Sequence, residues 1–276
     1  MSLVAVTIGF STHLLLGAMG GYTSERSGVI NIGLEGMMLT SACLAALVGA
    51  QSGPIAGLAA GIAGSTLLAL LHWLATQVYH IDHVISGMAI NALGAGGTNF
   101  LYDRFSDKNV IEVPTVPAAL LKVLAFVLPI AIWLYVKKTR GGLRLLAVGS
   151  DPDKARLMGV QPLRVRLFGL IATGILTGLG GVSFVAEVHV FTNDMTAGWG
   201  FIALAALILG GWRPIPTMLA CIGFGFFSAL RIRLEGNPHL PAIPPEAWAS
   251  LPYLVTIIAL AGFLGKGRTP AGLGKA

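Results

Sequence analysis

Long apolar runs, separated by short polar segments, fill most of the chain. A membrane-spanning helix needs about 20 mainly apolar residues, and two of the runs, 199–213 and 250–265, are short by this measure. The pattern predicts an all-α, polytopic membrane helix bundle of about eight to ten spans, with residues 1–276 as a single transmembrane domain. The predicted spans are 2–22, 28–50, 54–78, 84–102, 118–136, 165–186, 199–213, 216–234 and 250–265.

Composition agrees with a membrane protein and limits the chemistry of the chain. Only 11% of the residues are charged and the mean hydropathy is +0.79, whereas a soluble domain usually carries about 25% charged residues. The sequence has no GxxxxGK[ST] phosphate loop and no group of His and Cys residues with metal-ligand spacing. We therefore expect no cofactor, no metal and no catalytic residues in this chain.

Positive charge is concentrated in loop 137–166, which has eight Lys or Arg residues against two Asp residues. Cytoplasmic loops carry an excess of Lys and Arg, so we expect this loop and the C-terminus to be cytoplasmic and the N-terminus to be outside. The net charge of +6 then requires no nucleic-acid partner. Arg231 and Arg233 are exceptions to this rule, because they lie at the end of span 216–234 that is expected to be outside. Either this span ends early or the two arginines pair with Glu235.

A short helix is predicted inside this loop, over residues 152–158. Asp151 is a suitable N-cap, Pro152 a suitable first helical residue, and Gly159 a suitable terminator. The helix carries Leu157 and Met158 at its tip, and a loop in water rarely exposes such a pair without a partner. We expect a docking surface formed by Asp151, Asp153, Ala155, Arg156, Leu157, Met158 and Gly159.

Polar side chains inside the spans are candidates for a translocation pathway. Asn31 and Glu35 are four residues apart, which places both on one face of a helix, and Asn91 and Asn99 are two turns apart. Intramembrane carboxylates usually face a bundle interior or an aqueous cavity. The alternative is structural: hydrogen bonds between helices, or a cap for a broken helix. Glu25 and Arg26 are expected to form an ion pair at the interface.

Several motifs together resemble the ABC-importer permeases of the branched-chain type, especially the nucleoside-importing members. "SERSGVINIGLEGMM", "VISGMAINALGAGGTNFL" and "GWGFIALAALILGGWRP" are similar to segments of that family in order and spacing. In the cytoplasmic loop, Asp153, Ala155 and Gly159 take the E, second A and G places of the family's EAAxxxG coupling motif. Lys154 departs from the motif, and its distal I-x-LP portion is not evident.

The resemblance implies a permease subunit that moves nucleosides by alternating access in a bacterial inner membrane. It also implies three partners: a cytoplasmic ATPase that binds the ATP, a second homologous permease subunit in a heterodimer, and an extracytoplasmic substrate-binding protein. Simple sugars and branched-chain amino acids are alternative cargoes. A rival hypothesis is an ion-coupled secondary transporter with Glu35 or Asp82 as the proton carrier. An intramembrane enzyme is disfavoured, because the spans contain no paired catalytic carboxylates.

Overall fold

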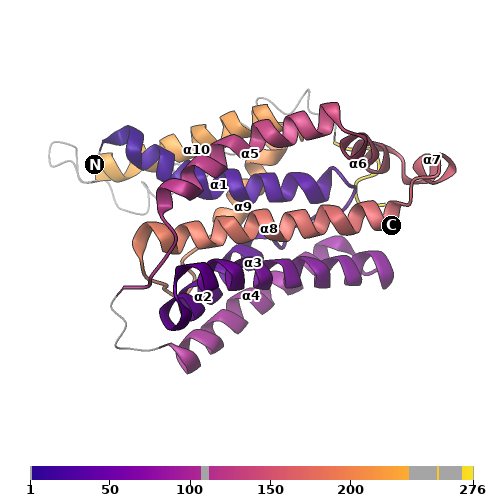
Figure 1. Cartoon of the computed structure of the whole chain (residues 1–276). Helices are drawn as coiled ribbons and strands as arrows, with labels where there is room; N and C mark the ends of the chain where they lie inside the picture. Colours follow the sequence, from indigo (N-terminus) through magenta and orange to yellow (C-terminus); the bar gives the residue numbers. More distant parts are fainter. Residues whose placement is uncertain (1, 107–111, 236–253, 255–268, 276) are drawn as a thin grey trace.

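In the computed structural model, six of the predicted spans form helices that are long and apolar enough to cross a membrane, counted over the residues that the structure describes (Figure 1). The structure describes residues 2–106, 112–235, 254 and 269–275, and these confirm the all-α membrane bundle. The six are α1 (Leu3–Glu25), α2 (Leu34–Ser52), α3 (Pro54–Trp73) with its continuation η1 (Leu74–Val78), α5 (Ala118–Lys138), α8 (Pro162–Val188) and α10 (Pro214–Glu235).

Two other predicted spans differ from the standard membrane helix. Helix α4 (His83–Phe105) has 23 residues but is more polar than the six. Helix α9 (Trp199–Leu209) has only 11 residues, which corresponds to about 16 Å, roughly half of the hydrocarbon core. The span predicted at 250–265 falls outside the described residues, except for Leu254.

The second predicted span begins later than the sequence pattern suggested. Residues 28–33 are apolar enough to extend the helix, but α2 begins only at Leu34. Residues 26–33 therefore form an unwound segment between α1 and α2. This corrects the prediction that Asn31 and Glu35 share a helix face.

Helices α1, α2 and α8 form the inner part of the bundle, and glycines allow close contacts there. Helix α1 packs against α8, α10, α9 and α5, and α2 packs against α3, α8 and α4. Where α2 crosses α4, a Cβ added to Gly94 would lie only 2.6 Å from the Cα of Gly36. Small residues at such crossings let backbones approach, which is the main packing device available in lipid.

Two further helices, α6 (Arg140–Ser150) and α7 (Pro152–Leu157), lie within loop 137–166. Helix α7 agrees with the predicted short helix, whereas α6 was not predicted. Thr139 caps α6 by accepting a hydrogen bond from Gly142 N (3.0 Å), and Leu145 and Val148 are buried against the bundle. Helices α6 and α7 and residues 269–275 lie at one end of the bundle, here named the α7 end; the N-terminus lies at the opposite end (Figure 1).

Arg231 does not mark an early end of α10. The helix continues to Glu235, and the Nε atom of Arg231 lies 3.5 Å from the Glu235 carboxylate. Of the two alternatives, the structure therefore favours pairing for Arg231.

Candidate functional site

The unwound segment 26–33 is buried, which is unusual for a connection between two membrane helices. Ser27, Val29 and Asn31 each have 0% exposed surface. Helix α1 ends because Gly28 adopts φ +99, and the Gly28 and Val29 N–H groups turn back onto the carbonyls of Glu25 and Ser24. Irregular backbone at membrane depth is tolerated only where protein or an aqueous cavity satisfies its polar groups. The side chains that hydrogen-bond to this backbone therefore define the site.

Two histidines hold the backbone of Ile30. The Ile30 N–H donates to Nδ1 of His83 (3.1 Å), and Nε2 of His72 donates to the Ile30 carbonyl (2.9 Å). Because Nε2 of His72 donates, its Nδ1 in the neutral ring accepts from the hydroxyl of Ser86, 2.8 Å away. His83 accepts a hydrogen bond from Ile30 and His72 donates one to it, so the two side chains together hold the unwound backbone in place.

Asn91 of α4 holds the next part of the segment. Its Nδ2 donates to the Ile32 carbonyl (3.0 Å), and its Oδ1 accepts from the Gly36 N–H (2.8 Å). Asn31 acts locally, since its Oδ1 accepts from the Gly33 N–H (3.0 Å). Both asparagines therefore satisfy backbone groups at the start of α2.

Glu35, in the first turn of α2, caps the broken helix α9. Its Oε1 accepts from the Gly198 N–H (2.8 Å) and its Oε2 from the Gly200 N–H (2.6 Å). These are among the N–H groups that a helix N-terminus leaves without an intrahelical partner, and the helix dipole favours a negative charge there. A Cβ on Gly200 would lie 2.5 Å from the Glu35 backbone nitrogen, so only glycine allows this approach. The geometry matches the helix-cap alternative.

Glu25, the last residue of α1, reaches the other end of α9. Its buried carboxylate accepts a hydrogen bond from the indole N–H of Trp212, in the turn after α9. The predicted ion pair with Arg26 is wrong, because no such pair forms between these two described residues. The α9 half-helix is therefore held at both ends by glutamates that flank the unwound segment.

Arg166 is a site residue that the sequence pattern did not single out. It is the fifth residue of α8 and is only 3% exposed. Its guanidinium donates to the Ser27 carbonyl (3.3 Å), to Oε1 of Gln77 (2.6 Å) and to the Lys275 carbonyl (2.5 Å). It thus joins the start of α8 to the unwound segment, to η1 and to the C-terminal residues. The only signal in the sequence was the position of this arginine just inside a predicted apolar span.

The C-terminal residues 269–275 reinforce this connection. The Gly274 N–H donates to the Gly28 carbonyl (2.9 Å), and the Gly272 N–H donates to the Gly149 carbonyl (2.9 Å). They therefore bridge the unwound segment to the end of α6, immediately before α7.

Helix α7 projects from this assembly with apolar residues at its tip. Asp151 accepts a hydrogen bond from Lys154 N (3.0 Å), and this bond, with the Lys154 ammonium nearby, lowers the pKa of Asp151. Pro152 and Ala155 are buried, whereas Leu157 is 87% exposed and Met158 is 84% exposed. Gly159 ends the helix with φ +80. The exposed pair has the character of a surface that another protein covers.

The comparison with known families shows which family the chain belongs to. The model of the branched-chain amino acid transport system permease component matches residues 3–260. The chain belongs to this permease family.

Several relatives match nearly all of this permease sequence. It is 34% identical to the guanosine ABC transporter permease protein NupQ of Bacillus subtilis, over 97% of this chain and 93% of NupQ. It is 33% identical to the nucleoside ABC transporter permease protein NupC of Lactococcus lactis, over 97% of this chain and 94% of NupC. A putative glucose ABC transporter permease protein, TsgC13 of Haloferax volcanii, is 29% identical over 94% of this chain and 90% of its own length.

The structure of the permease brings three of the four predicted pathway residues together. Asn31, Glu35 and Asn91 all lie around the unwound segment and the start of α2. Asn99 lies two turns further along α4, and its buried Oδ1 atom has no hydrogen-bond partner among the residues that the structure describes. Their role in a pathway stays a prediction.

Proposed function

We propose that this permease is one membrane subunit of an ATP-driven importer and that it carries nucleosides by alternating access. The observation that supports this most directly is the projection of Leu157 and Met158 from α7, next to a capped and otherwise polar helix turn. In the proposal a cytoplasmic ATPase covers this tip. The nucleoside cargo is inferred from NupQ and NupC, and a simple sugar is the alternative suggested by TsgC13.

The α7 end faces the cytoplasm in this proposal. Support comes from the eight basic residues of loop 137–166, since cytoplasmic segments carry such an excess. The C-terminal residues 269–275 lie at the same end, and the N-terminus and residues 112–117 lie at the other (Figure 1). An extracytoplasmic substrate-binding protein would deliver cargo at the end of the bundle opposite to the α7 end. The membrane would be the bacterial plasma membrane.

A second, homologous permease subunit would pack against α4. The outward face of this helix exposes Met88, Leu93 and Phe100, and a Cβ added at Gly96 or Gly97 would meet open space. Glycines on a membrane helix allow a partner backbone to approach closely. The same helix carries the Asn99 Oδ1 atom, for which the described part of the chain offers no hydrogen-bond partner. A pathway between two such subunits would place Asn99 near one wall and the Asn31, Glu35 and Asn91 group behind it.

Motion of the ATPase would reach the pathway through the connections at the α7 end. Displacement of α7 moves the start of α8, because only residues 158–161 separate these helices. Arg166 passes the displacement to the unwound segment through Ser27. Glu25 and Glu35 then pass it to the two ends of α9. Discontinuous helices at a central site are a common device of transporters.

The proposal is tested by gentle extraction of the complex from its native membrane, followed by identification of the co-purifying subunits. ATP hydrolysis is then measured in lipid with the binding protein and with panels of nucleosides, sugars and amino acids. A stoichiometric ATPase stimulated by nucleosides is the expected result. Stimulation by sugars alone would reassign the cargo, and a lone chain without an ATPase would support the ion-coupled transporter.

A further inference from the structure

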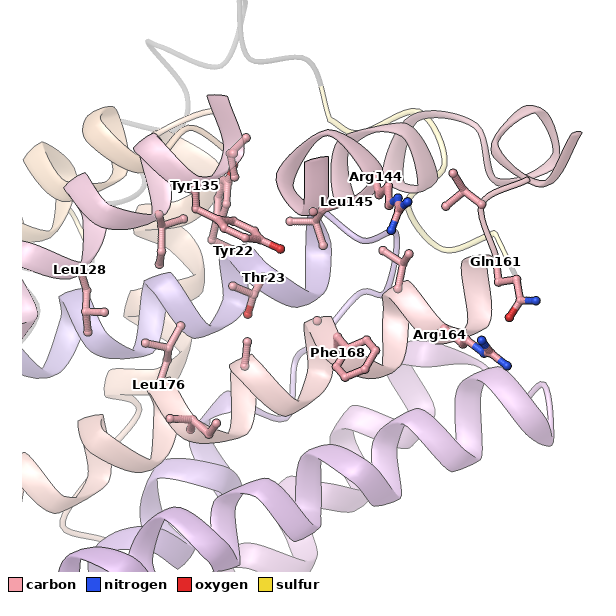
Figure 2. A pocket seen from close by; sticks show the side chains of 18 of the residues that line it. Tyr22, Thr23, Leu128, Tyr135, Arg144, Leu145, Gln161, Arg164, Phe168 and Leu176 are labelled. Atoms are coloured by element: carbon pink, nitrogen blue, oxygen red, sulfur yellow. The ribbon is translucent and has the colours of Figure 1, made fainter. Parts of the chain in front are cut away.

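A groove of about 770 Å³ opens at the α7 end between α5, α6 and α8 (Figure 2). Tyr22 and Thr23 of α1 contribute to its lining. Part of the lining is accessible from outside, since Phe168 is 68% exposed and Tyr135 is 48% exposed. The groove therefore opens toward the surroundings of the bundle.

The groove is apolar along most of its length and basic at one end. Leu128, Ile132 and Leu176 are among the apolar residues, whereas Arg144 of α6 and Arg164 of α8 are the two charged residues in the described part of the lining. Figure 2 shows both arginines toward the α7 end and Leu128 and Leu176 toward the other. Among the residues that the structure describes, no acidic residue lines the groove and neither arginine forms an ion pair.

The length of the groove corresponds to one leaflet of a bilayer. Leu176 follows Arg164 by 12 residues on the same helix (176 − 164), which is about 18 Å at 1.5 Å per residue. Half of the hydrocarbon core is about 15 Å. An acyl chain anchored by its headgroup at the arginines would therefore lie along the apolar wall down to about the middle of the bilayer.

We propose that this groove binds one anionic phospholipid from the leaflet at the α7 end. Two guanidinium groups that have no ion-pair partner among the described residues suit a phosphate group, which arginine binds through paired hydrogen bonds. Basic pockets between membrane helices at the cytoplasmic side bind anionic headgroups in this way. Both arginines are exposed, so a headgroup at the membrane surface can reach them.

The bound lipid would link the two helices that flank α7. Arg144 belongs to α6, which precedes α7, and Arg164 belongs to α8, which follows it. A shared phosphate would restrain their separation and so the position of the projecting tip. The inference rests on the groove itself and holds whatever the cargo of the permease is.

Native mass spectrometry of the purified permease, titrated with phosphatidylglycerol or phosphatidylcholine, tests the proposal. The wild type should retain one phosphatidylglycerol in preference to phosphatidylcholine. Arg144→Gln combined with Arg164→Gln should weaken this binding about 30-fold, because it removes both guanidinium groups that would contact the phosphate directly. Lys138→Gln combined with Arg140→Gln removes equal charge from exposed residues outside the groove and should have little effect.

A second variant separates a lipid from a free phosphate. Ala172→Phe places bulk in the apolar part of the groove, leaves both arginines intact, and should displace the lipid. Equal retention of the two lipids by the wild type would overturn the proposal. Phosphatidylglycerol binding that is unchanged in the double arginine variant, or in Ala172→Phe, would also overturn it, as would displacement of the lipid by a nucleoside.

Discussion

Oε2 of Glu35 accepts a hydrogen bond from the backbone N–H of Gly200 at 2.6 Å, so a carboxylate of the second helix caps a half-helix far along the chain. This contact explains why the motif that follows the unwound segment carries a glutamate inside an apolar region. A carboxylate inside a membrane protein is costly unless it is hydrogen-bonded; Glu35 is half-buried, and its two oxygens accept from two backbone N–H groups. The acidic group therefore stabilises a break in the helix pattern.

Glu35→Gln is expected to lower the stability of the permease and to reduce transport. The glutamine carbonyl can accept one of the two hydrogen bonds, but its NH₂ group cannot accept the other. The loss of one hydrogen bond to a charged group is worth about 1.5–3 kcal/mol. Thermal unfolding in detergent and uptake by proteoliposomes measure the two effects. Glu112→Gln alters an exposed acid and serves as the control. Lost transport with unchanged stability would instead favour a direct role of Glu35 in the pathway.

Arg166→Met is expected to destabilise the fold more strongly than Glu35→Gln. The change removes the donor for the Ser27 carbonyl, the Gln77 side chain and the Lys275 carbonyl at once. Ser27 and Gln77 are buried, and each buried acceptor left without a partner costs about 1–3 kcal/mol. Thermal unfolding measures the loss, and Arg140→Met provides a matched change at an exposed arginine. Equal melting temperatures for the two variants would show that the hydrogen bonds of Arg166 do not stabilise the fold.

Met158→Asp is expected to abolish association with the proposed ATPase while leaving the permease folded. Met158 is 84% exposed, so the substitution should change the free energy of unfolding by no more than about 0.5 kcal/mol. A carboxylate in a covered apolar contact would be desolvated without a partner. Co-purification of the ATPase and nucleoside uptake are the measurements, with Met158→Leu as the apolar control. Normal uptake by Met158→Asp would exclude α7 as the docking helix.

Cysteine labelling tests which side of the membrane the α7 end faces. Lys154→Cys should react with a membrane-impermeant maleimide only from the cytoplasmic side, and Ser52→Cys, at the opposite end, only from outside. The native Cys43 and Cys221 each have 0% exposed surface, so background labelling should be low. Reaction of Lys154→Cys from outside in intact cells would reverse the proposed topology.

The sequence alone determined the class of fold and the short helix α7. Long apolar runs require helices in lipid, because the backbone has no water to satisfy its polar groups. Helix α7 was predictable since Asp151, Pro152 and Gly159 act within one or two turns of the residues that they cap or terminate. The family resemblance was likewise carried by contiguous motifs.

Only the tertiary structure decided the state of residues 26–33 and the role of Glu35. Locally, "GVINIG" is apolar enough to continue a helix, and the spacing of Asn31 and Glu35 fits one helix face. The segment unwinds because side chains from distant helices satisfy its backbone: His72, His83, Asn91 and Arg166. Helix α9 is short for a related reason, since Glu35 satisfies its first N–H groups. A break in a membrane helix depends on such long-range partners, and no local pattern encodes them.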